Sequence, residues 1–79
     1  MRLDKFLKVS RIIKRRSVAN EVCDAQKIKV NGNIAKASYI VKIGDIIEIS
    51  IGNKSMKLKV ENINEYTTKE TAQNNYKIL

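Results

Sequence analysis

Three consecutive cations, Lys14, Arg15 and Arg16, stand directly before the segment "SVANEVCD", whose apolar residues recur at helical spacing. Lysine and arginine side chains bind anions, and phosphate groups above all. The N-terminus of a helix carries about half a positive charge, so three cations there cost stability unless an anion meets them. A phosphate can accept hydrogen bonds from the free N–H groups of a first helical turn and from arginines together. The pattern therefore predicts that this segment binds phosphate.

The positive charge is concentrated in the N-terminal half of the chain. The 79 residues have a formal net charge of +8, with ten cations and three acids in residues 1–36 but six cations and five acids in residues 37–79. A merely solvated basic surface would give a more even distribution, so the asymmetry indicates a polyanion bound by the N-terminal half. The candidate binding residues are Arg2, Lys5, Lys8, Arg11, Lys14, Arg15, Arg16 and Lys36, and Lys27 and Lys29 would extend this patch.

Side chains that serve catalysis or metal binding are scarce. The chain has no histidine, which is the commonest general base and a common metal ligand. Cys23 lies on the apolar stripe of the predicted helix, so we expect a buried small side chain rather than a nucleophile. The three glycines form no phosphate-cradling loop. We therefore expect no enzymatic activity, no metal and no cofactor.

The aromatic residues are too dispersed to form a stacking platform for single-stranded nucleic acid. They are Phe6, Tyr39, Tyr66 and Tyr76. We expect recognition through phosphates and through the shape of a folded, double-helical RNA instead. Charge alone does not exclude DNA, but the predicted helix has acids on its outer face and would read a major groove poorly.

Hydrophobic spacing predicts helices first and strands after them. The expected ranges are 3–9 and 16–25 for the helices, the second ending near Gln26, then strands from residue 27 and at 46–51 and 56–61, with a turn at 52–54 between the last two strands, and a last helix at 67–76. Asn31 and Gly32 predict a hairpin turn, because both residues tolerate positive φ. The last helix rests on a capping box that begins at Thr67. The chain is thus predicted to be α+β, with a domain at residues 1–63 and a short C-terminal helical tail at residues 64–79.

The two N-terminal helices are expected to cover one face of the sheet, because no residues are left for another layer. Their apolar contributions would be Leu3, Phe6, Leu7, Val18, Val22 and Cys23. The cations of the same helices must then face outward.

The N-terminal segment has charges every few residues and no apolar core of a signal peptide. No stretch approaches the roughly 20 apolar residues of a membrane span. A single cysteine excludes an internal disulfide and fits a reducing compartment. We expect a cytoplasmic protein without membrane contact.

Four segments of the chain resemble the S4 RNA-binding domain. They are "RLDKFL" at 2–7, "RRSVANEV" at 15–22, "KIKVNG" at 27–32 and "VKIGDIIEI" at 41–49, and the similarity covers residues 2–51. The resemblance implies two helices packed on a small antiparallel sheet. It also implies that the chain's start and the beginning of the second helix meet RNA phosphates. Gln26 departs from the family, which usually has glycine there, and this affects how the chain leaves the helix.

Within that family, the chain is similar to a short stand-alone group that acts in bacterial ribosome quality control and is related to ribosome-associated heat-shock S4 proteins. The similarity rests on "MRLDKFLKVSRIIKRRSVANEV", "NGNIAKAS" and the tail "TTKETAQNNYKIL". It implies a non-enzymatic factor that binds the rRNA of the obstructed large ribosomal subunit together with peptidyl-tRNA. This factor would support alanine tailing of stalled chains by an RqcH-type elongation factor. A monomer is expected.

The resemblance implies that Arg2 and Arg16 bind phosphate. Asp4 would either organise one of these arginines or stabilise the helix dipole, and Asn31 is primarily a turn residue. Replacing Arg16 with alanine is expected to weaken RNA binding and to leave stability nearly unchanged. Two alternatives stay open: a general ribosome-associated heat-shock or recycling S4 protein, and a basic adaptor of an acidic protein surface.

Overall fold

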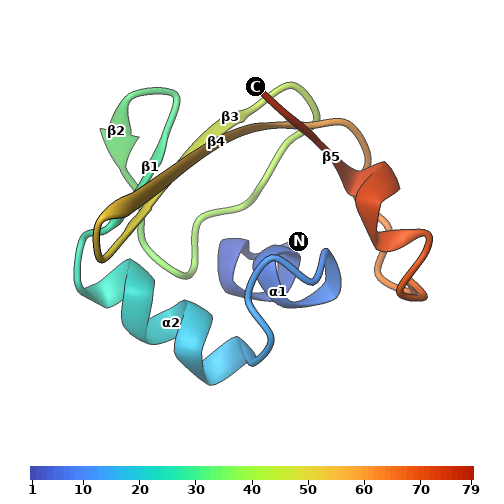
Figure 1. The fold of residues 1–79 in the computed structure, drawn as a ribbon, viewed down its shortest axis with the longest axis horizontal. Helices are drawn as coiled ribbons and strands as arrows, with labels where there is room; N and C mark the ends of the chain where they lie inside the picture. Colours follow the sequence, from blue (N-terminus) through green and yellow to red (C-terminus); the bar gives the residue numbers. More distant parts are fainter.

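Residues 1–79 form two helices on one face of a five-stranded antiparallel sheet in the computed structural model (Figure 1). The elements are α1 (Leu3–Val9), α2 (Arg16–Asp24), β1 (Ile28–Val30), β2 (Asn33–Ile34), β3 (Ile46–Ile51), β4 (Lys54–Val60), the 3₁₀ helix η1 (Ala72–Asn75) and β5 (Tyr76–Ile78). The strand order is β2-β1-β3-β4-β5. This arrangement confirms the predicted α+β class and both N-terminal helices. None of the helical segments has the apolar length that crossing a bilayer requires.

The hairpin between β1 and β2 forms at the predicted turn. Asn31 and Gly32 have φ values of 52° and 86°, and Val30 pairs with Asn33 across the two-residue loop. Both residues thus adopt the left-handed backbone that this type of hairpin turn requires.

The core lies between α1, α2 and the inner face of the sheet. Its fully buried side chains include Leu3, Phe6 and Leu7 of α1 and Ile28, Ile47, Leu58 and Val60 of the strands. On α2, the buried residues are Ala19 and Cys23, whereas Val18 is 40% exposed, so the prediction for Val18 was wrong. Successive helical residues are about 100° apart, and the small residues at 19 and 23 form the stripe that packs inward.

The predicted C-terminal helix at 67–76 is not confirmed, because only the four-residue 3₁₀ helix η1 lies within this range. The hydroxyl groups of Thr68 and Thr71 each accept a hydrogen bond from the other residue's backbone N–H, at 3.2 and 2.8 Å. This reciprocal pair, one residue later than predicted, replaces the expected capping box that begins at Thr67. The fully buried Asn75 donates its amide to Ser10 Oγ at 3.1 Å. Residues 76–78 then pair with β4 as β5. An isolated helix of ten residues is marginal, so pairing with a free strand edge prevails.

Candidate nucleic-acid interface

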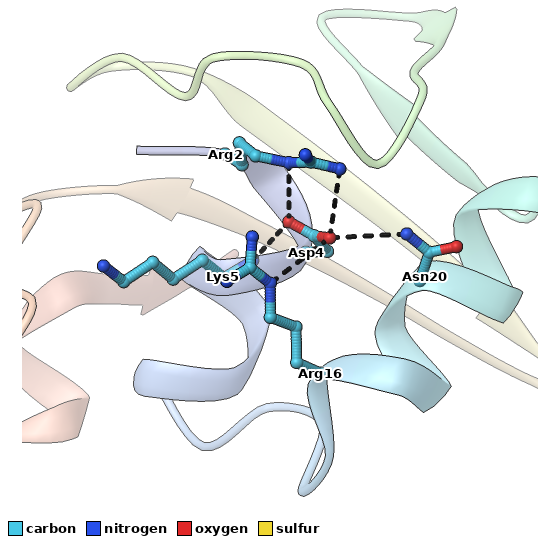
Figure 2. A network of polar contacts seen from close by, with 5 residues as sticks. All are labelled: Arg2, Asp4, Lys5, Arg16 and Asn20. Atoms are coloured by element: carbon cyan, nitrogen blue, oxygen red, sulfur yellow. Dashed lines mark hydrogen bonds and ion pairs between the residues drawn. The ribbon is translucent and has the colours of Figure 1, made fainter.

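A buried carboxylate, that of Asp4 in the first turn of α1, joins the start of the chain to the start of α2 (Figure 2). Asp4 is only 2% exposed. Its Oδ1 lies 3.3 Å from Nε of Arg2, and its Oδ2 lies 3.4 Å from Nε of Arg16. The two arginines are 14 residues apart in sequence, and one carboxylate brings their guanidinium groups together.

The carboxylate of Asp4 also accepts two further hydrogen bonds. The side-chain amide of Asn20, one turn after Arg16 on α2, donates to Oδ2 at 3.4 Å, and the backbone N–H of Lys5 donates to Oδ1 at 2.8 Å. Asn20 was not among the residues predicted from the sequence to take part in the site. Its spacing of four residues from Arg16 is the signal that could have found it, because residues four apart share one helix face.

Burial alone would raise the pKa of the Asp4 carboxyl. Hydrogen bonds from the Arg16 guanidinium and the Asn20 amide, with the backbone N–H of Lys5, outweigh burial and hold this pKa below its usual value. Asp4 is therefore ionised at neutral pH. One negative charge faces two guanidinium groups, so the pair of arginines keeps a net charge of +1.

The side chains of Arg2 and Arg16 remain 47% and 48% exposed although both contact a buried anion. Each guanidinium has five N–H donors, of which Asp4 occupies one or two. The remaining donors face solvent and can bind a phosphate oxygen. Asp4 thus fixes the two arginines in position and leaves most of their donors free.

The other predicted binding residues lie just before α2, at the end of α1 and beside Arg2. Arg15 and Lys14 are exposed in the segment just before α2, and neither makes an ion pair. Lys8 and Arg11 line a groove together with Lys14 at the end of α1. Lys36 lines a shallow hollow that Arg2 also borders. These cations thus surround the α1–α2 region.

Lys5 differs from the other candidate lysines because it has an anionic partner. Its Nζ lies 3.1 Å from Oε1 of Glu65, and both side chains are partly exposed. Exposed ion pairs of this kind contribute about 0–1 kcal/mol. Lys5 remains within reach of solvent, but part of its charge is neutralised.

Lys27 and Lys29 do not extend the patch around Asp4. Ile28 and Val30 of β1 point into the core towards the helices, so Lys29 between them faces the opposite side of the sheet. Lys27 and Lys29 line a hollow there with Lys57. The sheet separates this second basic surface from the helical one.

Asn31 occupies the predicted turn and has an additional structural role. Its Nδ2 donates to Oδ1 of the buried Asp45 at 3.1 Å, and its Oδ1 accepts the backbone N–H of Ile46 at 2.9 Å. Asp45 also accepts from the Tyr39 hydroxyl at 2.8 Å and from the backbone N–H of Lys42 at 2.9 Å. This network ties residues 39–45, which follow Lys36, to the hairpin turn. No local pattern in the sequence predicts this role of Asp45.

The thiol of Cys23 is poorly suited to nucleophilic chemistry. Its residue is 3% exposed, and burial, together with the charges of Asp4 and Asp24, raises the pKa of Cys23 to about 11. The thiolate, which is the reactive form, is thus scarce at neutral pH.

Two helices that present arginines from one face of a small antiparallel sheet define an RNA-binding domain of the S4 type. The model of the S4 domain family matches residues 1–47, and the chain belongs to this family. Among its relatives are proteins named RQC P-site tRNA stabilizing factor. The one from Streptococcus pneumoniae is 54% identical over 79 residues, which are 100% of this chain and 90% of the relative. The one from Bacillus subtilis is 53% identical over the whole chain and 92% of the relative.

One solved structure matches this fold over the whole of the present chain. The trimeric structure of heat shock protein 15 from Vibrio cholerae matches with a TM-score of 0.93 and 32% sequence identity. The match covers 100% of this chain and 81% of that one. The five-stranded sheet and the two helices therefore recur in a relative that is named differently.

Proposed function

We propose that this protein is a cytoplasmic, RNA-binding factor of ribosome quality control that stabilises tRNA on the large ribosomal subunit. The observation that carries the proposal is the pair of half-exposed arginines, Arg2 and Arg16, held by one buried carboxylate at the start of α2. Relatives named for stabilising P-site tRNA in this process cover the whole chain at about half identity. The protein would bind without catalysing a reaction, because its site offers guanidinium donors and no activated nucleophile.

The finer proposal follows from the group that the sequence resembles. The helical surface would bind rRNA of the obstructed subunit and the peptidyl-tRNA that it carries. A monomer bound there would hold the tRNA in place while an RqcH-type elongation factor extends the stalled chain with alanine. Phosphate contacts through arginine and lysine suit this task, because they position an RNA without reading its sequence.

Sedimentation with purified large subunits that carry peptidyl-tRNA tests the binding. The wild-type protein is expected in the subunit fraction, and the double variant Arg2→Ala, Arg16→Ala is expected at the top of the gradient. Lys54→Ala is the matched control, because Lys54 is an exposed cation on β4 that does not contact Asp4. Raising the salt should release the wild type, with a log–log slope of about 0.7–0.9 per phosphate contacted. A wild-type protein that stays free of subunits at low salt would contradict the proposal.

A second candidate function is that of a general heat-shock or recycling factor. The likeness to heat shock protein 15 over the whole chain favours it. Both functions use the same arginines, so binding does not separate them. The two functions are separated by measuring the alanine tails on stalled chains with and without the protein. Tails that are shorter without the protein support the first function. Tails of unchanged length, together with intact binding to the subunit, support the second.

A further inference from the structure

The largest groove of the molecule lies between the C-terminal end of α1 and the segment 65–68 of the tail. It encloses about 700 Å³. One wall carries three cations, Lys8, Arg11 and Lys14, and the other wall is formed by Glu65, Tyr66, Thr67 and Thr68. The groove is therefore basic on the side of α1 and has an aromatic ring on the side of the tail.

Specific bonds hold the two walls together. The hydroxyl of Thr67 donates to the backbone carbonyl of Val9, which joins the tail to the last residue of α1. Glu65 is neutralised by Lys5 at 3.1 Å, so the acid of this wall has a cationic partner of its own. Arg11, two residues after the end of α1, has a φ of 58°, a left-handed conformation that non-glycine residues seldom adopt. The groove is thus formed by fixed segments on both sides.

The ring of Tyr66 is the most exposed large apolar group of the chain. It is 93% exposed, whereas the rings of Tyr39 and Tyr76 pack against the core. Tyr66 therefore contributes little to stability through burial. Its position beside three cations is the arrangement that binds unpaired nucleotides, in which a base stacks on an aromatic ring and neighbouring phosphates meet basic side chains.

We propose that this groove is a subsite for a single unpaired nucleotide of RNA, with the base stacked on Tyr66 and the flanking phosphates bound by Lys8, Arg11 and Lys14. The subsite rests on the proposed function, since it requires that the protein binds RNA. It adds to that function a preference for RNA in which a helix is interrupted by an unpaired nucleotide. The arginines at Asp4 would bind the paired part, and Tyr66 would recognise the interruption.

Three RNA hairpins with the same stem test the subsite by fluorescence anisotropy. The first is fully paired, the second has one bulged nucleotide, and the third has the same bulge without its base. The third RNA keeps the extra phosphate and removes only the group that stacks. Wild-type protein is expected to bind the bulged hairpin about 5- to 100-fold more tightly than the abasic one, which is the range that stacking of one base provides.

Substitutions of Tyr66 complete the test. Tyr66→Ala should lose the preference for the bulged RNA and bind all three hairpins alike, and Tyr66→Phe should retain the preference because it retains the ring. Ile43→Ala is the control, because Ile43 is 65% exposed and does not line the groove. Since Tyr66 is so exposed, none of these changes should affect folding, which circular dichroism checks.

The possible failures are distinguishable. If wild-type protein binds the three hairpins with equal affinity, or if Tyr66→Ala keeps the preference, the subsite is overturned and the proposed function stands. If wild-type protein binds none of them at low salt and does not sediment with large subunits, both the function and the subsite are overturned.

Discussion

At the scale of single residues, the position of Arg2 and Arg16 depends on Asp4. A buried carboxylate without partners would be costly, and this one is stabilised by the two arginines and Asn20. The arginines in turn are held near each other although like charges repel. Each member of this cluster therefore affects both the stability of the fold and the geometry of the proposed phosphate site.

The lowered pKa of Asp4 predicts how stability changes with pH. Because the pKa of Asp4 in the folded state lies below its usual value, the ionised group adds stability above about pH 4, and this contribution is lost as the pH falls through the folded-state pKa. Asp4→Asn should lower the free energy of unfolding by about 1–3 kcal/mol at pH 7.

Urea unfolding of both proteins at pH 7 and at the lowest pH at which both still fold measures this effect. The difference between wild type and Asp4→Asn should shrink at low pH, because the wild-type carboxyl is then protonated as well. A difference that is the same at both pH values would show that the charge of Asp4 is not what stabilises the fold.

Replacing Arg16 and replacing its neighbour Arg15 should affect stability differently. Arg16→Ala removes a partner of the buried Asp4 and should lower the free energy of unfolding by about 1 kcal/mol. Arg15→Ala should leave it unchanged or raise it by a few tenths, because an unpaired cation leaves the positive end of α2. Both variants should weaken RNA binding.

Denaturant unfolding and RNA titration of the two variants check this prediction. It revises the expectation from sequence that Arg16 could be replaced without loss of stability, because the sequence left open whether Asp4 pairs with an arginine or only stabilises the helix dipole. If Arg16→Ala is as stable as the wild type, the contact between Arg16 and Asp4 does not stabilise the fold.

At the scale of the elements, α2 ends at an unusual residue. Gln26 has a φ of 60°, and the backbone N–H groups of Gln26 and Lys27 donate to the carbonyls of Cys23 and Val22 at 2.9 and 3.2 Å. These bonds close the helix through a left-handed residue, the position where glycine is usual. The predicted helix end near Gln26 is confirmed, and the chain turns there although the family's glycine is missing.

Gln26→Gly is therefore expected to stabilise the protein. A non-glycine residue in the left-handed region costs about 1 kcal/mol, and glycine removes this cost. The midpoint of thermal unfolding should rise. Ala25→Gly is the control at the preceding position, where φ is −77°, and should lower the midpoint because glycine gains nothing there and loses backbone entropy. If both variants are destabilised, the left-handed turn is not strained by Gln26.

The tail is the element that the sequence pattern misassigned. Thr67 and Glu70 have the spacing of a capping box, but the hydroxyls of Thr68 and Thr71 close a local turn instead. Asn75 is fully buried against Ser10, which no local pattern indicates. The tail thus extends the sheet with β5 and forms one wall of the groove beside α1.

At the scale of the whole molecule, a net charge of +8 on 79 residues has opposite effects on folding and on binding. Repulsion among the cations destabilises the folded chain, and the same cations attract RNA. Salt screens both interactions, whereas the buried contacts of Asp4 are screened less.

Raising the KCl concentration from 50 to 500 mM should therefore raise the thermal unfolding midpoint while it lowers the affinity for RNA. Differential scanning fluorimetry and anisotropy titrations in the same buffers measure the two quantities. A midpoint that falls with salt would mean that surface ion pairs such as Lys5–Glu65 outweigh the repulsion among the cations.

The sequence by itself determined the α+β order, both N-terminal helices, the Asn31-Gly32 turn and the basic character of the N-terminal half. These features follow from hydrophobic spacing, turn chemistry and charge, which act between neighbours in the chain. Only the tertiary structure decided that Arg16 pairs with Asp4, that Val18 lies outward, and that residues 76–78 join the sheet. Each of these depends on segments far apart in sequence. Their contacts form only when the helices pack on the sheet, so local patterns could not reveal them.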